Sequence, residues 1–205
     1  TGENGSGELG LGDTTDRYQW VKNPYFGPDA TNNSITCEVS CLVPNIYGGY
    51  QFSGTVRCFA ILHDGRVMGW GNNNGGAIGD GTTNNRSVPT IITGITNVKQ
   101  ISAGIRDTYV VDSSGNLFHS GNNDNGVGGG ASRTSFAQVT GVSNVGQACL
   151  HGTGYYSSGY AAQAYVIQTN GDTFGIGYNG NGNLGIGNTT NQSAFVQIGG
   201  SENFS

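Results

Sequence analysis

A chain of 205 residues is long enough for one ordinary domain with a sizeable buried core. Its 38 glycines and its low charge, 10% of residues, favour turns and strands and exclude long helices. Eight Lys and Arg residues against thirteen Asp and Glu give a net charge of -5. The basic field that attracts a nucleic-acid backbone is therefore missing, and we expect no nucleic-acid partner.

The sequence contains no sign of a membrane segment. No apolar run approaches the ~20 residues that a membrane-spanning helix requires. The first residues also lack the charged and apolar regions of a signal peptide. We therefore expect a soluble chain without membrane insertion. Because Thr1 stands inside a repeat, we expect a processed or partial product.

A Gly-rich segment opens the chain and returns three times. The sequence G-E-N-G-S-G-E-L-G-L-G-D-T-T begins at Gly2, and related copies begin at Gly71 and Gly177. A degraded copy, G-N-N-D-N-G-V-G-G-G-A-S, begins at Gly121. The four starts, at 2, 71, 121 and 177, are 69, 50 and 56 residues apart. A unit of about fifty residues is typical of propellers and other repeat architectures.

Three of these copies follow a hairpin pattern. Each hairpin has β-branched and aromatic residues on both sides of a two-residue turn that ends in Gly, which can accept a positive φ. The predicted hairpins start at Phe59, Tyr109 and Tyr165, with turns at Asp64-Gly65, Ser114-Gly115 and Asn170-Gly171. With four strands to a unit, such repeats predict the blades of a β-propeller.

At these same residues the chain resembles the regulator-of-chromosome-condensation repeat family. That family's unit has a Gly-x-Asn-x-x-Gly-x-Leu-Gly-x-Gly core, a following Arg and Pro, a strand ending in Ala-Gly, and a D-G-x-V-x-x-W-G hairpin. The matching positions are Arg86, Pro89, Ala103, Gly104, Asp64, Gly65 and Trp70. The resemblance implies an all-β, seven-bladed β-propeller, of which about three to four blades are present.

We therefore expect residues 1–205 to form a single β-propeller region. Its repeat cores start near 2, 71, 121 and 177, and its insertions span 23–55 and 151–162. A terminal repeat without its neighbour would expose an apolar edge. Either more chain or another molecule must close the ring, and we expect a longer parent protein.

The two insertions share a place in the repeat. Measured from Cys41, Ser102 and Cys149, which we align at one strand position, the next hairpin aromatic follows after 18, 7 and 16 residues. Both insertions should therefore rise on the same face. Their Tyr, Gly and Ser content is typical of recognition loops, although these aromatics could instead pack on their own blades or on a neighbouring subunit. The candidate contacts are Tyr47, Tyr50, Phe52, Tyr155, Tyr156 and Tyr160.

The four cysteines favour structural roles. We expect Cys58 and Cys149 to be buried free thiols. Cys37 and Cys41 lie close enough for a local disulfide, or for half of a zinc site. A single C-x-x-x-C without a second pair is a weak metal motif, so we expect no metal.

No motif for catalysis emerges. The dinucleotide pattern G-x-G-x-x-G occurs from Gly5 and from Gly180, but inside the repeat and without the strand–helix context that would give it a mechanism. His63, His119 and His151 occupy different repeat positions and form no catalytic arrangement. We expect no cofactor and no enzymatic activity.

Three functions stay open. The first is a non-enzymatic propeller on a cell or virion surface, such as a tail-fibre or adhesion module that binds a cell-surface glycan or protein. The second is an intracellular protein-binding propeller, since the resemblance implies relatives that act as a guanine-nucleotide exchange factor or a protein inhibitor. The third is an architectural decoration protein that contacts other chains of its own assembly.

Overall fold

The computed structural model describes residues 1–26, 39–45, 56–156 and 159–199, with no side chains for 39–45 and 152–160. These residues form twelve strands and two short 3-10 helices, η1 (Asn74–Gly76) and η2 (Asp124–Gly126). The all-β prediction is confirmed. No helix in the described part of the chain is long and apolar enough to cross a membrane.

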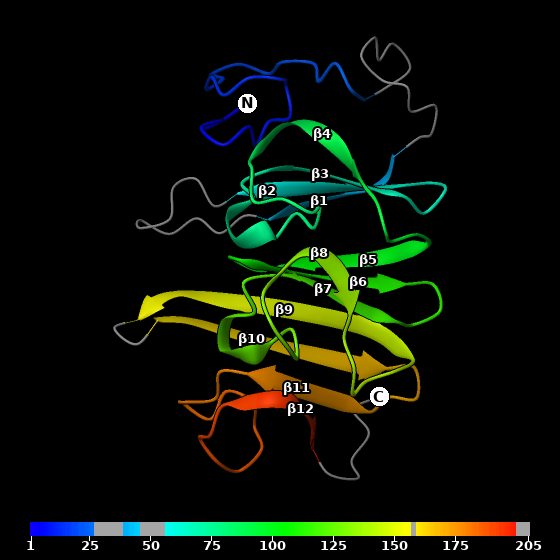
Figure 1. The fold of residues 1–205 in the computed structure, drawn as a ribbon, viewed down its shortest axis with the longest axis vertical. Coiled ribbons are helices and arrows are strands. Elements are labelled where there is room, and N and C mark those ends of the chain that lie inside the picture. Colours follow the sequence, from blue (N-terminus) through cyan, green and yellow to red (C-terminus); the bar gives the residue numbers. More distant parts are fainter. Residues whose placement is uncertain (27–38, 46–55, 157–158, 200–205) are drawn as a thin grey trace.

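The strands form three four-stranded antiparallel sheets, which are the predicted blades. Each blade is a meander in which consecutive strands pair. The first blade contains β1 (Val39–Asn45), β2 (Arg57–Leu62), β3 (Val67–Gly71) and β4 (Arg86–Ile92). The second contains β5 (Val98–Ala103), β6 (Asp107–Asp112), β7 (Leu117–Gly121) and β8 (Arg133–Gln138). The third contains β9 (Val145–Tyr156), β10 (Gly159–Gln168), β11 (Thr173–Gly177) and β12 (Gln192–Ile198). Figure 1 shows the three sheets stacked along the long axis of the molecule.

The three predicted hairpins are the two middle strands of the three blades. Their registers match: Phe59 pairs with Gly69, Tyr109 with His119, and Tyr165 with Gly175. The glycines of the turns adopt left-handed backbone conformations, with φ of +80° at Gly65 and +79° at Gly115. A side chain is strained in that region, which explains why Gly ends each turn.

Apolar side chains fill the space between blades. One cluster joins the first and second blades and includes Phe59, Ile61 and Val110. Another joins the second and third blades and includes Tyr109, Val111 and Ala164. Burial between sheets is the main stabilising term, since each removed Å² of apolar surface contributes roughly 25 cal/mol.

The four Gly-rich loops share one hydrogen-bonded design. In the second loop Asn73 is completely buried, and its Nδ2 donates to Asp80 Oδ1 and to the Thr82 carbonyl, both at 3.0 Å. Its Oδ1 accepts from the backbone N–H of Ile78 at 2.8 Å. The buried Asn4 and Asn179 make corresponding bonds in the first and last loops. A buried amide satisfies the backbone of a loop that has no strand partner.

Residues 1–26 form only part of a blade. Gly2 bridges to Arg17, as Gly71 pairs with Arg86 and Gly177 with Gln192. This segment therefore corresponds to the Gly-rich loop and the start of the fourth strand of a blade that precedes the first. It lies beside the first blade, at the top of Figure 1.

Candidate binding surface

The Gly-rich loops and the connections between the first two strands lie at one end of each blade, which we call the loop end. In each of the three blades, the backbone N–H of the residue after the third strand donates to a backbone carbonyl. That carbonyl lies just before the second strand or within it. These bonds run from Asn72 N to Val56 O at 2.9 Å, from Asn122 N to Arg106 O at 3.1 Å, and from Tyr178 N to Ala162 O at 2.7 Å. The loop end of each blade is thereby built from two segments.

The 151–162 insertion falls at this end, between the first and second strands of its blade. Of the predicted 23–55 insertion only the last part, 46–55, falls at the matching connection, because β1 (Val39–Asn45) lies inside that range and belongs to the first blade. The sequence alignment of Cys41 with Ser102 and Cys149 is wrong by two residues. Val43 is the residue that pairs with Phe59, as Ser102 pairs with Tyr109 and Cys149 with Tyr165. The first strand of every blade has a bulge at the same place, after Val39, Val98 and Val145, so the registers of the three blades coincide. With the corrected register, residues 43 and 59 are sixteen apart, and so are residues 149 and 165.

The insertion of the third blade is an extended hairpin. Strands β9 and β10 continue pairing beyond the blade, with His151 opposite Gln163 and Tyr155 opposite Tyr160. Figure 1 shows this hairpin reaching past the end of the second blade. The candidate residues Tyr155, Tyr156 and Tyr160 therefore lie at its tip. The other three candidates, Tyr47, Tyr50 and Phe52, lie outside the described residues.

The second blade lies between the two insertions and has only the short connection 104–106. Arg106 and Asp124 approach there, with Nη1 and Oδ1 separated by 3.7 Å. The Asn122 amide, with its oxygen turned toward this guanidinium, accepts from Arg106 Nε at 2.9 Å. Burial raises the pKa of Asp124, and the nearby Asp107 acts in the same direction. This centre is polar and half-buried, so it could donate and accept hydrogen bonds.

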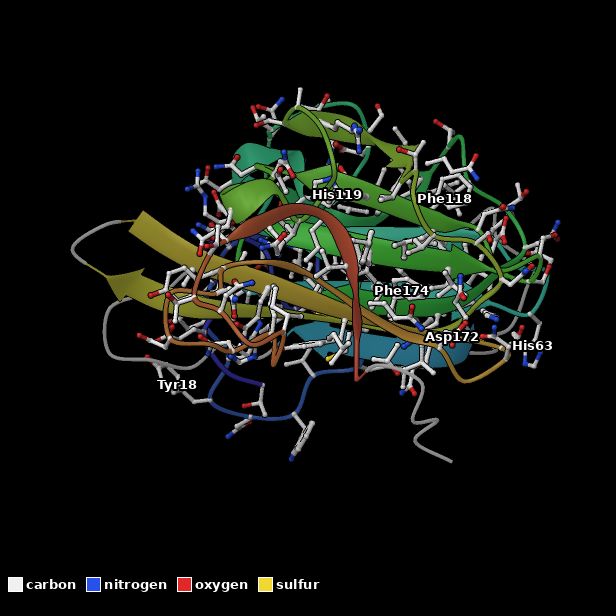
Figure 2. The ribbon with its side chains drawn as sticks, turned by 90° about the horizontal axis from the view of Figure 1, so that it is seen from below. Tyr18, His63, Phe118, His119, Asp172 and Phe174 are labelled. Atoms are coloured by element: carbon white, nitrogen blue, oxygen red, sulfur yellow. The ribbon has the colours of Figure 1, made fainter. Side chains whose placement is uncertain are left out.

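A buried hydrogen-bonded pair of His119 and Asp107 lies beneath that centre. His119 Nε2 lies 2.8 Å from Asp107 Oδ1, and the backbone N–H of Asn123 donates to the same oxygen at 2.6 Å. Figure 2 shows His119 inside the stacked sheets and Tyr18 at the outer edge of the molecule. His119 Nδ1 is buried and has no hydrogen-bond partner among the described residues. Through the bond from Asn123, Asp107 holds the third Gly-rich loop, which begins at Gly121.

Arg57 ties the first blade to the second. Its side chain is completely buried and donates to the carbonyls of Gly104 at 2.7 Å and Ile105 at 2.6 Å. Burial lowers the pKa of Arg57 to about 10, although Asp107 acts in the opposite direction. The guanidinium therefore holds the short connection of the second blade in place.

The cysteines only partly follow the expectation. Cys58 is half-buried, its Sγ donates to the Glu8 carbonyl at 3.6 Å, and burial raises the pKa of its thiol to about 11. Cys149 is exposed rather than buried, because the face of β9 that carries it is not covered by another sheet. Cys37 lies outside the described residues, so its bridge to Cys41 stays a prediction.

Two kinds of site chemistry find no support among the described residues. No group of three or more His, Cys, Asp or Glu side chains is placed to hold a metal ion there. His63 lies in a turn, whereas His119 and His151 lie on β7 and β9 of different blades. The described residues of this end offer hydrogen-bond donors and acceptors, such as Arg106 and Asp124.

Sequence reasoning missed Arg57, Asp107 and His119. Arg57, Asp107 and Gln163 occupy one repeat position, opposite Gly71, Gly121 and Gly177. An alignment of the three hairpins by their register would have marked His119 as the residue that replaces a glycine. The burial of Arg57 has no such signal, because it depends on the neighbouring blade.

Comparisons with known proteins agree with this fold. Residues 64–111 match the model of the regulator of chromosome condensation (RCC1) repeat. Human WBSCR16 is similar in structure, with a TM-score of 0.70 and 20% identity over 98% of this chain and 48% of its own. Prp20p from Saccharomyces cerevisiae has a TM-score of 0.58 and 18% sequence identity, over 71% of this chain and 36% of its own. Its structure is described with its binding to Gsp1p and histones. Yeast RCC1 (Prp20) bound by Kap60 has a TM-score of 0.56 and 16% sequence identity, over 71% of this chain and 35% of its own. The chain thus spans about half or less of the length of these proteins.

Proposed function

We propose that this chain, which is built of RCC1-type repeats, is a non-enzymatic binding module whose recognition surface is the loop end. The ligand is a cell-surface glycan or protein, and the setting is a cell or virion surface, such as a tail fibre. One observation carries the proposal: two blades carry insertions at the same strand connection, with the same spacing of sixteen residues, on either side of a plain blade. Matched insertions on one end suit a two-sided contact.

The residue types support recognition rather than catalysis. Tyrosine offers a large rigid surface at low entropic cost, and its ring can stack on a sugar while its hydroxyl forms hydrogen bonds. The six candidates are divided between the insertions, three in each: Tyr47, Tyr50, Phe52, Tyr155, Tyr156 and Tyr160. Between them, Arg106 and Asp124 provide polar groups that can orient a ligand.

The test is a loss-of-binding experiment on the hairpin. Residues 151–162 are shortened to the length of the plain 104–106 connection, and in a second variant all six aromatic candidates become Ala. Binding is measured on a glycan array and to intact cells. We expect both variants to lose binding while their circular dichroism spectra and melting temperatures stay close to the parent's.

A matched control changes exposed aromatics elsewhere. Tyr18 and Trp20 are 93% and 90% exposed on the N-terminal segment. The double change to Ala should leave ligand binding intact. Unchanged binding after all six candidate substitutions would overturn the proposal, and equal loss in the control would show that any exposed aromatic suffices.

Two other functions have weaker support. The Prp20p structure is described with binding to Gsp1p and histones, which favours an intracellular protein-binding role as the second candidate. An exchange assay on a small GTPase tests it, and acceleration of nucleotide release would displace the surface-binding proposal. An architectural decoration protein would bind its own assembly alone, and no glycan or cell.

A further inference from the structure

Ala162 fixes the base of the extended hairpin, residues 151–162, at the point where this insertion ends. Its side chain is 4% exposed and belongs to the core between the second and third blades. Its carbonyl accepts from the Tyr178 N–H at 2.7 Å. Its own N–H donates to Asn125 Oδ1 at 2.8 Å. The Asn125 amide is therefore a direct link from the second blade to the base of the hairpin.

Asn125 has a backbone conformation that glycine adopts without strain. Its φ is +55°, in the left-handed region that non-glycine residues rarely occupy. Gly75, at the matched position of the Gly-rich loop in the first blade, has a φ of +74°. A side chain in this region costs free energy relative to glycine, so its presence points to a function. For Asn125 that function lies outside its own loop, since its Oδ1 accepts from the third blade.

The second and third blades differ in what stands opposite their first connection. The second blade has the plain connection 104–106, and the loop of the first blade that faces it carries Gly75. A Cβ at Gly75 would clash with Asn122 Oδ1, so no side chain fits there. The third blade has the 151–162 insertion, and the loop of the second blade that faces it carries Asn125. A hydrogen-bond acceptor thus stands opposite the long connection, and a glycine stands opposite the short one.

The segment that carries Asn125 also carries part of the polar centre. Asp124, the preceding residue, approaches Arg106 with Oδ1 and Nη1 separated by 3.7 Å. The N–H of Asn123 donates to the buried Asp107 at 2.6 Å. Three consecutive residues therefore contact the buried core, the polar centre and the base of the hairpin. This arrangement sets where the hairpin stands relative to the centre.

We propose that Asn125 is a positioning residue of the recognition surface. It holds the base of the hairpin beside the Arg106–Asp124 centre, so that the hairpin and the centre contact the same ligand. This role rests on the proposed function of the loop end. The group that acts is the amide oxygen, because it accepts the Ala162 N–H where the hairpin leaves its blade. A hairpin held at its base needs less ordering when a ligand binds.

Hydrogen exchange of the Ala162 N–H in the 205-residue chain tests the link directly. Asn125→Gly removes the acceptor and relieves the left-handed strain. We expect the Ala162 N–H to exchange at least about tenfold faster while the melting temperature stays equal or rises. The N–H of Val166, in the middle of the same strand, is the internal reference and should not change.

Two further variants separate the acceptor from the backbone strain. Asn125→Ala lacks the acceptor but keeps the strain, so the same faster exchange should come with a lower melting temperature. Asn125→Asp keeps an acceptor oxygen at the same place and should restore slow exchange of the Ala162 N–H. If Asn125 only stabilised its own loop, the exchange rate would instead follow the melting temperature in all three variants.

Binding to the glycan array and to intact cells measures the effect on recognition. Asn125→Gly and Asn125→Ala should bind about tenfold more weakly than the parent chain, because a loosened hairpin has to be ordered on binding. Asn125→Asp should bind close to the level of the parent.

Unchanged exchange of the Ala162 N–H in both Asn125→Gly and Asn125→Ala would overturn the proposal. So would faster exchange with unchanged binding, since the position of the hairpin would then not matter to recognition. A parent chain that binds neither glycans nor cells would overturn the proposed function, whereas the exchange rates would still show whether Asn125 holds the hairpin.

Discussion

The second blade reaches the same fold as its neighbours with the large and small residues exchanged. In the first blade Gly69 on β3 faces Ile78 of the Gly-rich loop, and in the third Gly175 faces Leu184. In the second blade the strand position is His119 and the loop position is Gly128. A Cβ on Gly128 would lie 2.3 Å from the imidazole Nδ1, so the ring fills the space that an aliphatic side chain fills elsewhere.

This exchange shows that the repeat keeps the total side-chain volume at this contact, whereas the residue type at each of the two positions can change. Packing tolerates a swap that keeps total volume, but a polar ring needs a partner when it is buried. Asp107 provides that partner at 2.8 Å, at the position held by Arg57 and Gln163 in the other blades. The second blade therefore combines an altered shape with a buried hydrogen bond between His119 and Asp107.

The largest expected effect is at the link between the first two blades. Arg57→Ala removes the donors to Gly104 and Ile105 and leaves a cavity, so we expect a loss of roughly 3–5 kcal/mol in unfolding free energy. Urea denaturation measures it. Arg66→Ala, which breaks an exposed pair with Asp64, is the control and should cost at most about 1 kcal/mol. Equal losses would contradict the structural role of Arg57.

The volume exchange predicts compensation between two substitutions. Gly128→Leu clashes with the imidazole, and His119→Gly leaves a cavity and removes the hydrogen bond to Asp107. We expect each substitution to lower the free energy of unfolding by about 2–4 kcal/mol. The double variant should recover at least about 1 kcal/mol relative to the sum, since contacting residues couple. Melting temperatures of the four proteins complete the cycle, and strict additivity would refute the exchange.

A smaller loss of unfolding free energy should distinguish the regular Gly-rich loop at Gly71 from the degraded loop at Gly121. Asn73→Ala removes hydrogen bonds to Asp80, Thr82 and Ile78 inside a buried loop, so we expect a cost of roughly 2 kcal/mol. Asn123 is half-buried and has a φ of +58°. Glycine tolerates that conformation, so Asn123→Gly should cost about 1 kcal/mol or less. Denaturation curves test the order, and Asn74→Ala, on an exposed neighbour, should change little.

The smallest expected effect is on acid stability. Burial would raise the pKa of Asp80, but hydrogen bonds from Arg86 and Thr82 outweigh it and lower the pKa below 3.8. A carboxylate with a lowered folded pKa stabilises the protein above its unfolded pKa, and this contribution disappears as the pH falls through the folded value. Loop 71–85 should therefore lose stability progressively as the pH falls below about 4. In the second blade the matched residue is Arg133, which donates to the Gly128 carbonyl rather than to a carboxylate.

Hydrogen exchange between pH 5 and pH 2.5 follows each loop separately. Asp80→Asn should remove most of the acid response of loop 71–85. An equal response in loop 121–132 would show that Asp80 is not its cause.

The sequence alone determined the repeat, the three hairpins and the blade architecture, because turns with Gly and alternating β-formers are local signals. It also located the tyrosine-bearing parts of both insertions at one connection, although the predicted range 23–55 included the strand Val39–Asn45 of the first blade. The exact alignment of the first blade was out of its reach, since the Cys-Leu pair at residues 41–42 resembles the one at 149–150, whereas Val43 is the residue that matches Cys149. The Tyr-rich tip could be predicted as a candidate site because a comparison of repeat lengths shows the extra residues at this connection.

Only the tertiary structure decided the burial of Arg57, the pairing of His119 with Asp107, and the exposure of Cys149, Gln147 and Ile167. Each depends on whether another sheet lies against the residue in question. The same residue type at the same repeat position is covered in one blade and open in the next, as Gln100 and Gln147 show. Local sequence determines a blade, but the free energy of a side chain depends on the neighbour that covers it.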